Sequence, residues 1–203
     1  MKNKTISFKV ITVGDSGVGK TAIIRRYVSN SYQENTTTTV GIACAFKDIT
    51  LDNNQVISLK LIDTAGQEQF RSISKAYFKN ADAVLFVFDV SKKDTFDSIT
   101  YWIKEFNENN SKSEMPKYLL GNKCDLESVI SKDDIDKFLE ENKDYEYFET
   151  SAKNNISIDN LFKNVAEKLS KKIDEQKDKK QILKKVNKNE KKKKECCIAK
   201  ADE

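Results

Sequence analysis

The sequence contains no histidine, and this absence limits the chemistry open to the protein. Without an imidazole, the chain cannot use histidine as a general acid or base, and it cannot hold a metal through histidine nitrogen. Glycine and proline are also scarce, with six glycines and one proline among 203 residues. Each glycine therefore marks a place where the backbone needs special freedom.

Cysteine is rare and wrongly spaced for a zinc site or a disulfide framework. Cys44 and Cys124 lie far apart, and Cys196 and Cys197 are adjacent near the end. We expect a reducing, cytosolic setting. No apolar run reaches the length of a membrane span, and the first residues do not resemble a signal peptide.

The basic charge of the chain is confined to its end. Residues 171–203 contain 13 Lys and seven Asp or Glu, a net charge of +6, whereas the whole chain carries +4. Residues 1–170 therefore carry −2, which argues against a nucleic-acid-binding core. We expect one folded domain over residues 1–172 and a flexible, lysine-rich tail over residues 173–203.

Strand-like and helix-like segments alternate along the first 170 residues. Apolar runs predict strands over residues 6–13, 40–51, 56–62, 83–90, 117–121 and 145–150. Helical spacing predicts helices over residues 21–28, 94–107, 131–139 and from Ile158 onward. The pattern predicts an α/β fold, a three-layer sandwich with a six-stranded, mostly parallel sheet covered by helices on both faces. Functional loops are then expected at the carboxyl ends of the strands.

The first such loop follows the pattern G-x-x-x-x-G-K-[ST] between a predicted strand and a predicted helix. Its glycines let successive N–H groups surround a phosphate, Lys20 would reach the β- and γ-phosphates, and the Thr21 hydroxyl would bind Mg²⁺. The predicted phosphate-binding residues are Gly14, Asp15, Ser16, Gly17, Val18, Gly19, Lys20 and Thr21. Alone, this motif indicates only a nucleoside triphosphate.

The second loop is Asp63-Thr64-Ala65-Gly66-Gln67-Glu68. A carboxylate at Asp63 can hold Mg²⁺ through water, Gly66 lets the backbone approach the γ-phosphate, and Gln67 can orient an attacking water. Gln67 is thus the predicted catalytic residue.

Two further loops indicate which base is bound. In Asn122-Lys123-Cys124-Asp125, the Asp125 carboxylate can accept from N1–H and the 2-amino group of guanine, and adenine offers neither donor there. Lys123 would lay its aliphatic stem over the base, and Asn122 would tie the loops together. In Ser151-Ala152-Lys153, the N–H of Ala152 would donate to guanine O6. A kinase or ATPase is a weaker interpretation, because Asp125 has no purpose with adenine.

With all these motifs in order, the sequence resembles the Ras superfamily of small GTPases over residues 6 to about 170. It is most similar to the Rab branch, on the phosphate loop, Gln69-Phe70-Arg71-Ser72-Ile73, Tyr77-Phe78-Lys79-Asn80-Ala81 and the paired cysteines. The resemblance places the Mg²⁺-binding threonine of switch I on Thr39, with Thr36, Thr37 and Thr38 as neighbours that leave its register open. It also places the aromatic residue at the guanine edge on Tyr32.

The resemblance implies a Mg²⁺-dependent switch that binds GTP and GDP, hydrolyses GTP slowly and acts in vesicle trafficking. It also implies an exchange factor, a GTPase-activating protein and effectors as partners of a monomer. The alternative is an adaptor that binds guanine nucleotide without cycling. The effector surface is expected to be atypical, because Cys44 and Ile62 replace two residues of an aromatic triad, Ala43 replaces an aspartate, and Tyr77 alone of the triad remains.

The end of the chain predicts a membrane anchor. Four lysines, residues 191–194, precede Cys196 and Cys197, and lysines beside an anionic membrane contribute roughly 1 kcal/mol each. By resemblance, both cysteines carry geranylgeranyl groups, which would place the protein on the cytoplasmic face of an intracellular membrane with a cytosolic pool. Six residues follow the pair, so the ending is not a C-a-a-X box. The alternative is a solvated lysine tail with incidental cysteines.

Overall fold

The computed structural model describes residues 6–34, 42–64, 76–112 and 114–172 of the chain. The structure falls into two units, Met1–Glu167 and Lys168–Glu203, and the fold below is that of the first. Predicted features at residues 35–41, 65–75 and 173–203, Thr39, Gly66, Gln67, Cys196 and Cys197 among them, lie outside the described residues.

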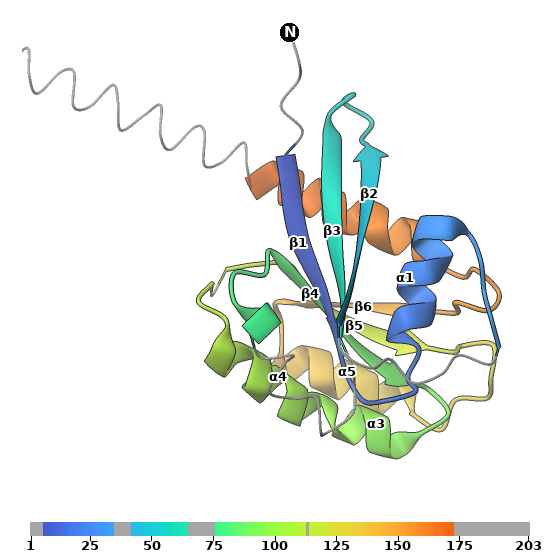
Figure 1. The fold of residues 1–203 in the computed structure, drawn as a ribbon. Helices are drawn as coiled ribbons and strands as arrows, with labels where there is room; N and C mark the ends of the chain where they lie inside the picture. Colours follow the sequence, from blue (N-terminus) through green and yellow to red (C-terminus); the bar gives the residue numbers. More distant parts are fainter. Residues whose placement is uncertain (1–5, 35–41, 65–75, 113, 173–203) are drawn as a thin grey trace, which may run out of the picture. The chain divides into compact units, whose positions relative to one another are not determined.

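A six-stranded sheet forms the centre of the first unit (Figure 1). Its strand order is β2-β3-β1-β4-β5-β6, with β2 antiparallel to β3 and the other pairs parallel. The strands are β1 (Ile6–Val13), β2 (Ile42–Thr50), β3 (Val56–Thr64), β4 (Ala83–Asp89), β5 (Lys117–Asn122) and β6 (Tyr145–Thr150). The predicted fold class is confirmed, and the predicted bounds of β1 and β6 are correct to the residue.

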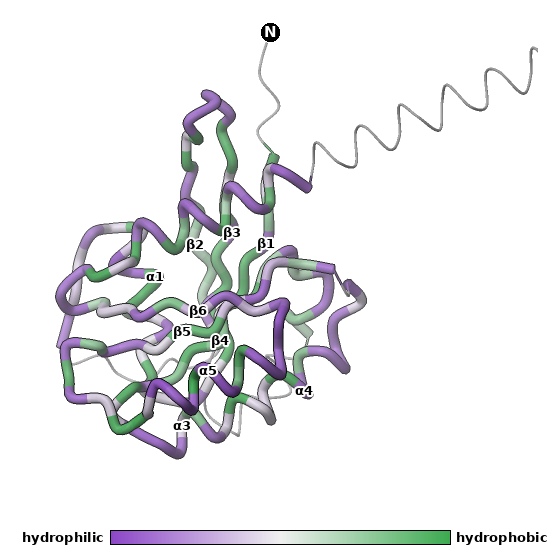
Figure 2. Tube along the Cα trace, turned by 180° about the vertical axis from the view of Figure 1, so that it is seen from behind, coloured by the Kyte–Doolittle hydropathy of each residue, from purple (hydrophilic) through white to green (hydrophobic). Residues whose placement is uncertain are grey.

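Helices lie on both faces of this sheet. They are α1 (Lys20–Ser29), α3 (Lys93–Asp97), α4 (Ile99–Asn109), α5 (Lys132–Glu141) and a helix that begins at residue 158. On one face, Tyr27 of α1 stacks on Phe162 of the last helix, with ring centroids 4.0 Å apart. On the other face, Trp102 and Phe106 of α4 and Ile135 of α5 pack with Phe86 of β4. Figure 2 shows the apolar residues concentrated along the central strands, as expected for a sheet covered on both sides.

The single helix predicted over residues 94–107 is wrong, because the segment forms α3 and α4 with Ser98 between them. The Ser98 backbone remains helical, at φ −69° and ψ −15°. Its hydroxyl donates to the Asp94 carbonyl at 2.9 Å, a contact that bends helices. The capping box predicted at Ser131 and Asp134 is confirmed, with the Asp134 N–H donating to Ser131 Oγ at 3.1 Å.

Among the described residues, no helix combines the length and the hydrophobicity needed to cross a membrane. The parallel strands all direct their carboxyl ends to one edge of the sheet, and the loops that follow β1, β5 and β6 meet there.

Candidate functional site: a nucleotide pocket at the carboxyl edge of the sheet

The loop between β1 and α1 has the backbone of an anion-binding turn. Gly19 lies at φ +98°, a left-handed conformation that glycine adopts at little cost, and it precedes the first turn of α1. A Cβ there would lie 2.2 Å from the side-chain nitrogen of Asn122, and a Cβ on Gly14 would lie 2.2 Å from the Val87 carbonyl oxygen. Glycine is therefore required at both positions by close packing against neighbouring strands.

Lys20 lies folded over this loop with its ammonium group held by main-chain oxygens. Its Nζ donates to the Gly14 carbonyl at 2.8 Å and to the Asp15 carbonyl at 2.6 Å. Lys20 is 5% exposed, and this burial lowers its pKa to about 8. An anion next to the ammonium would offset the cost of burying the positive charge.

Thr21 and Asp63 place oxygen atoms side by side at the start of α1 and the end of β3. The Thr21 hydroxyl donates to Asp63 Oδ2 at 2.6 Å. Asp63 is buried, which raises its pKa, and its Oδ1 has no hydrogen-bond partner within the described residues. A buried carboxylate oxygen without a partner needs a cation or water. This pair fits Mg²⁺, which takes a few protein oxygens and completes its shell with water and phosphate.

Asn122 links three loops at the end of β5. Its Nδ2 donates to the Val18 carbonyl in the phosphate loop at 2.8 Å, and its Oδ1 accepts from the Thr150 hydroxyl of β6 at 3.2 Å. Asn122 and Thr150 are both buried. The contacts hold the phosphate loop in a fixed position relative to the two segments predicted to bind the base.

Those two segments are joined at Asp125 and Ser151. The Ser151 hydroxyl donates to Asp125 Oδ1 at 2.5 Å and accepts from the Asn154 N–H at 3.0 Å. Beside them lies a pocket of about 400 Å³, within the usual range for a small-molecule site. Its lining includes Gly17, Gly19, Tyr32, Lys123, Asp125, Ala152 and Lys153. The structure thus brings two glycines of the predicted phosphate loop and all the predicted base-binding residues except Ser151 to the wall of one pocket.

Asp89 supports this pocket, although it belongs to none of the sequence motifs. Its side chain is 2% exposed, and Oδ2 pairs with Lys123 Nζ at 2.7 Å. Oδ1 accepts from the N–H and the hydroxyl of Ser91. Burial acts to raise the pKa of Asp89, but the donors from Lys123 and Ser91 outweigh it and lower the pKa. Lys123 has φ +66°, so Asp89 steadies a lysine whose backbone is in the left-handed region.

Trp102 is a second residue whose contact was missed. Helical spacing assigned it to the core, and it is buried, but its indole Nε1–H also donates to Asp15 Oδ1 at 2.8 Å. The main-chain oxygen of the same Asp15 holds Lys20. α4 therefore supports the phosphate loop across 87 residues of sequence. A buried aromatic residue has the same helical spacing in the sequence whether or not it also bonds to a loop, so the spacing could not reveal this contact.

The outer surface of β2 and β3 carries an exposed aromatic residue that does not belong to the triad. Cys44 and Ile62 are cross-strand partners; Cys44 is exposed, whereas Ile62 is buried and presents nothing to a partner. Two residues further along β2, Phe46 is 62% exposed, and the Lys60 ammonium lies 5.9 Å from its ring centroid. An exposed aromatic residue is therefore present on this surface. It lies two residues after Cys44, and residues two apart on a strand face the same side of the sheet.

The fold and the glycine loop define a P-loop nucleotide-binding protein, and comparison with known proteins narrows the class. A profile of the Ras family matches residues 9–171. The chain is similar to "Ras-related protein Rab-8A" of Bos taurus, with 37% identity over 82% of this chain and 80% of the relative. It is 37% identical to "Ras-related protein Rab-1" of Theileria parva, over 85% and 79% of the two chains.

A third relative is "Ypt/Rab-type GTPase YPT7" of Saccharomyces cerevisiae, with 37% identity over 78% of this chain and 79% of the relative. The chain belongs to the Ras family of small GTPases and is related to the Rab proteins.

Proposed function

We propose that the protein is a Rab-like switch that binds GTP and GDP with Mg²⁺, hydrolyses GTP slowly and acts in vesicle trafficking. One observation carries the nucleotide assignment. Asp125, Lys123 and Ala152 line the same 400 Å³ pocket as Gly17 and Gly19 of the phosphate loop. This arrangement fits a guanine nucleotide. The carboxylate and the main-chain loop at one end suit the base, and the anion-binding turn at the other end suits the phosphates.

The proposed roles follow from the contacts. Lys20 and the loop amides would bind the phosphates, and the base would lie between Asp125 and Ala152 with Lys123 and Tyr32 beside it. Thr21 would ligate Mg²⁺ and Asp63 would hold it through water; bound there, the ion would neutralise charge on the phosphate oxygens. By resemblance, Thr39 adds a metal ligand, Gly66 donates to the γ-phosphate, and Gln67 orients the attacking water.

Loss of the γ-phosphate would release the segments that carry Thr39 and Gly66, so that effectors distinguish the two states. An arginine supplied by a GTPase-activating protein raises the rate on the order of 10³–10⁵-fold in such enzymes. We therefore expect slow intrinsic turnover and dependence on partners for hydrolysis and exchange.

Single-turnover hydrolysis of fluorescent mantGTP tests the switch. Gln67→Leu should lower the hydrolysis rate by roughly tenfold or more, because the attacking water loses its orientation. The dissociation constant for GDP should stay within about twofold of the wild-type value, since Gln67 is assigned to the γ-phosphate end. A parallel loss of GDP affinity would refute this role for Gln67.

The adaptor alternative is separated by the same measurement. An adaptor locked on its nucleotide would release no phosphate from bound GTP, whether wild type or Gln67→Leu. Phosphate release by the wild-type protein, even over hours, would exclude that alternative.

We further propose that Cys196 and Cys197 carry prenyl groups that hold the protein on the cytoplasmic face of an intracellular membrane. The support is their position after residues 191–194, all lysine. Replacing both cysteines with serine should move the protein from the membrane fraction to the cytosol. An unchanged membrane share would defeat the assignment.

A further inference from the structure

Arg26 lies outside every motif discussed above, yet its side chain contacts the predicted base-binding loop directly. It projects from α1, where its Nε donates to the Ala152 carbonyl at 2.8 Å and its Nη2 donates to the Lys153 carbonyl at 2.9 Å. The guanidinium therefore holds two successive carbonyls of a segment 126 residues further along the chain. A planar fork of donors suits such a pair of acceptors.

The guanidinium is itself fixed in place. Its Nη1 donates to the Asn30 carbonyl at 3.1 Å, and Asn30 ends α1 with a left-handed backbone at φ +49°. The Tyr32 ring centroid lies 6.0 Å from Arg26 Cζ, within the range of a cation–π contact. Contacts on both sides of the fork leave Arg26 little freedom to move away from the loop.

These contacts fix the two peptide planes that follow Ala152 and Lys153. Because a peptide bond is planar and trans, fixing the Ala152 carbonyl also directs the Lys153 N–H to the opposite side. The Ser151 N–H donates to Ile156, and the Asn154 N–H donates to Ser151 Oγ. In contrast, no described residue accepts from the N–H groups of Ala152 and Lys153, and both residues line the pocket. Two donors in one loop are thus left for a ligand.

We propose that Arg26 is a positioning residue for base recognition: it holds the Ala152–Lys153 turn so that its amides bind guanine O6. This inference rests on the guanine-nucleotide function proposed above and adds a specificity determinant outside the motifs. Asp125 reads the N1–H and the 2-amino group, and Arg26 acts through the main chain on the opposite substituent. An adenine amino group at C6 would meet two donors and no acceptor.

Three nucleoside diphosphates separate this role from a general loss of structure. IDP retains O6 and N1–H and lacks the 2-amino group, whereas the 2-aminopurine nucleotide retains the amine and lacks both O6 and N1–H. Arg26→Lys keeps the charge but loses the fork, and Arg26→Gln keeps one amide nitrogen in place of three guanidinium nitrogens. The control is Arg25→Lys on the same helix. This change alters an exposed contact in which Arg25 Nη1 donates to Gln33 Oε1.

Arg26→Lys and Arg26→Gln should each weaken GDP and IDP by the same factor, on the order of tenfold, as expected for loss of about one hydrogen bond. Their affinity for the 2-aminopurine nucleotide should stay within twofold of wild type, and Arg25→Lys should resemble wild type throughout. Equal losses for all three nucleotides, or no loss for GDP, would overturn the inference. A wild-type protein that binds none of the three would instead overturn the proposed function.

Discussion

The nucleotide pocket and the outer surface of β2 and β3 differ in how their side chains are held. In the pocket, Asn122, Asp125 and Lys123 each bond to a residue from another loop or strand. On the outer surface, Cys44 and Phe46 are both exposed, and the Phe46 ring has the Lys60 ammonium 5.9 Å from its centroid. A change in the pocket disturbs several elements at once, whereas a change on the surface leaves the fold intact.

This difference explains where the chain keeps the family pattern and where it departs from it. The motif residues of the described loops are intact. Of the three departures, Ala43 and Cys44 lie at exposed positions of β2, whereas Ile62 is buried in β3. Cross-linked polar residues tolerate little substitution, because a lost partner leaves a buried group unsatisfied. Residues at exposed strand positions can be substituted without loss of the fold, and their identity can follow the partner that the surface binds.

Asp125→Asn should give the largest effect in the pocket. The carboxylate loses its paired acceptance of N1–H and the 2-amino group, so GDP affinity should fall on the order of 10⁴-fold. Xanthosine diphosphate, whose 2-oxo group can accept from the new amide, should then bind better than GDP. Competition calorimetry measures both, with Asp136→Asn on the exposed side of α5 as the control. Retained preference for GDP would contradict the role of Asp125.

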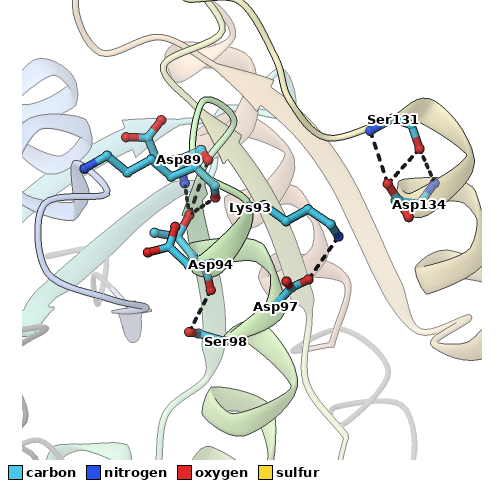
Figure 3. A network of polar contacts seen from close by, with 9 residues as sticks. Asp89, Lys93, Asp94, Asp97, Ser98, Ser131 and Asp134 are labelled. Atoms are coloured by element: carbon cyan, nitrogen blue, oxygen red, sulfur yellow. Dashed lines mark hydrogen bonds and ion pairs between the residues drawn. The ribbon is translucent and has the colours of Figure 1, made fainter.

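Asp89→Asn should have a smaller effect on the same pocket. The change removes the charge that pairs with Lys123 at 2.7 Å, and should cost about 1–3 kcal/mol in the free energy of unfolding. GDP should also dissociate faster, because Lys123 loses its support. The control is Asp97→Asn, which breaks the exposed pair with Lys93 shown in Figure 3 and should behave like wild type in urea denaturation. Equal behaviour of the two variants would refute the support by Asp89.

Acid should reduce the advantage that Asp89 provides. The pKa of Asp89 is lowered in the fold, so its stabilising effect is complete above its ordinary pKa of 3.8 and is lost as pH falls through the lower folded value. The difference in unfolding free energy between wild type and Asp89→Asn should therefore be constant from pH 7 to about pH 5 and shrink below pH 4. A difference that widened in acid would have the wrong sign. Titration of Asp63 contributes equally to the unfolding free energy of both proteins, so it cancels in the difference.

Phe46→Ser should have the smallest effect on the fold and the pocket. Because the ring is 62% exposed, the free energy of unfolding should change by less than about 0.5 kcal/mol and GDP affinity should not change. Phe86→Ala, at a buried position of β4, should cost about 3–5 kcal/mol in the same denaturation assay. If Phe46→Ser weakened GDP binding several-fold, the separation between surface and pocket would be broken.

Much of the fold could be read from local patterns. The continuous apolar run at residues 83–90 corresponds to β4, every residue of which is buried. The capping box at Ser131 and Asp134 was recognisable because its two partners lie three residues apart. The division of the predicted helix at Ser98 was not recognisable. The sequence does not show whether the serine hydroxyl bonds to solvent or to the Asp94 carbonyl.

In the pocket, the sequence alone predicted which groups would touch the nucleotide, because phosphate, Mg²⁺ and guanine each demand particular side chains at fixed spacing along a loop. Only the tertiary structure could identify the residues that hold those groups. Trp102 reaches Asp15, Asp89 reaches Lys123 and Arg26 reaches Ala152 across 87, 34 and 126 positions of sequence. No local pattern records such pairs, because they form only when parallel strands bring their carboxyl ends to one edge of the sheet.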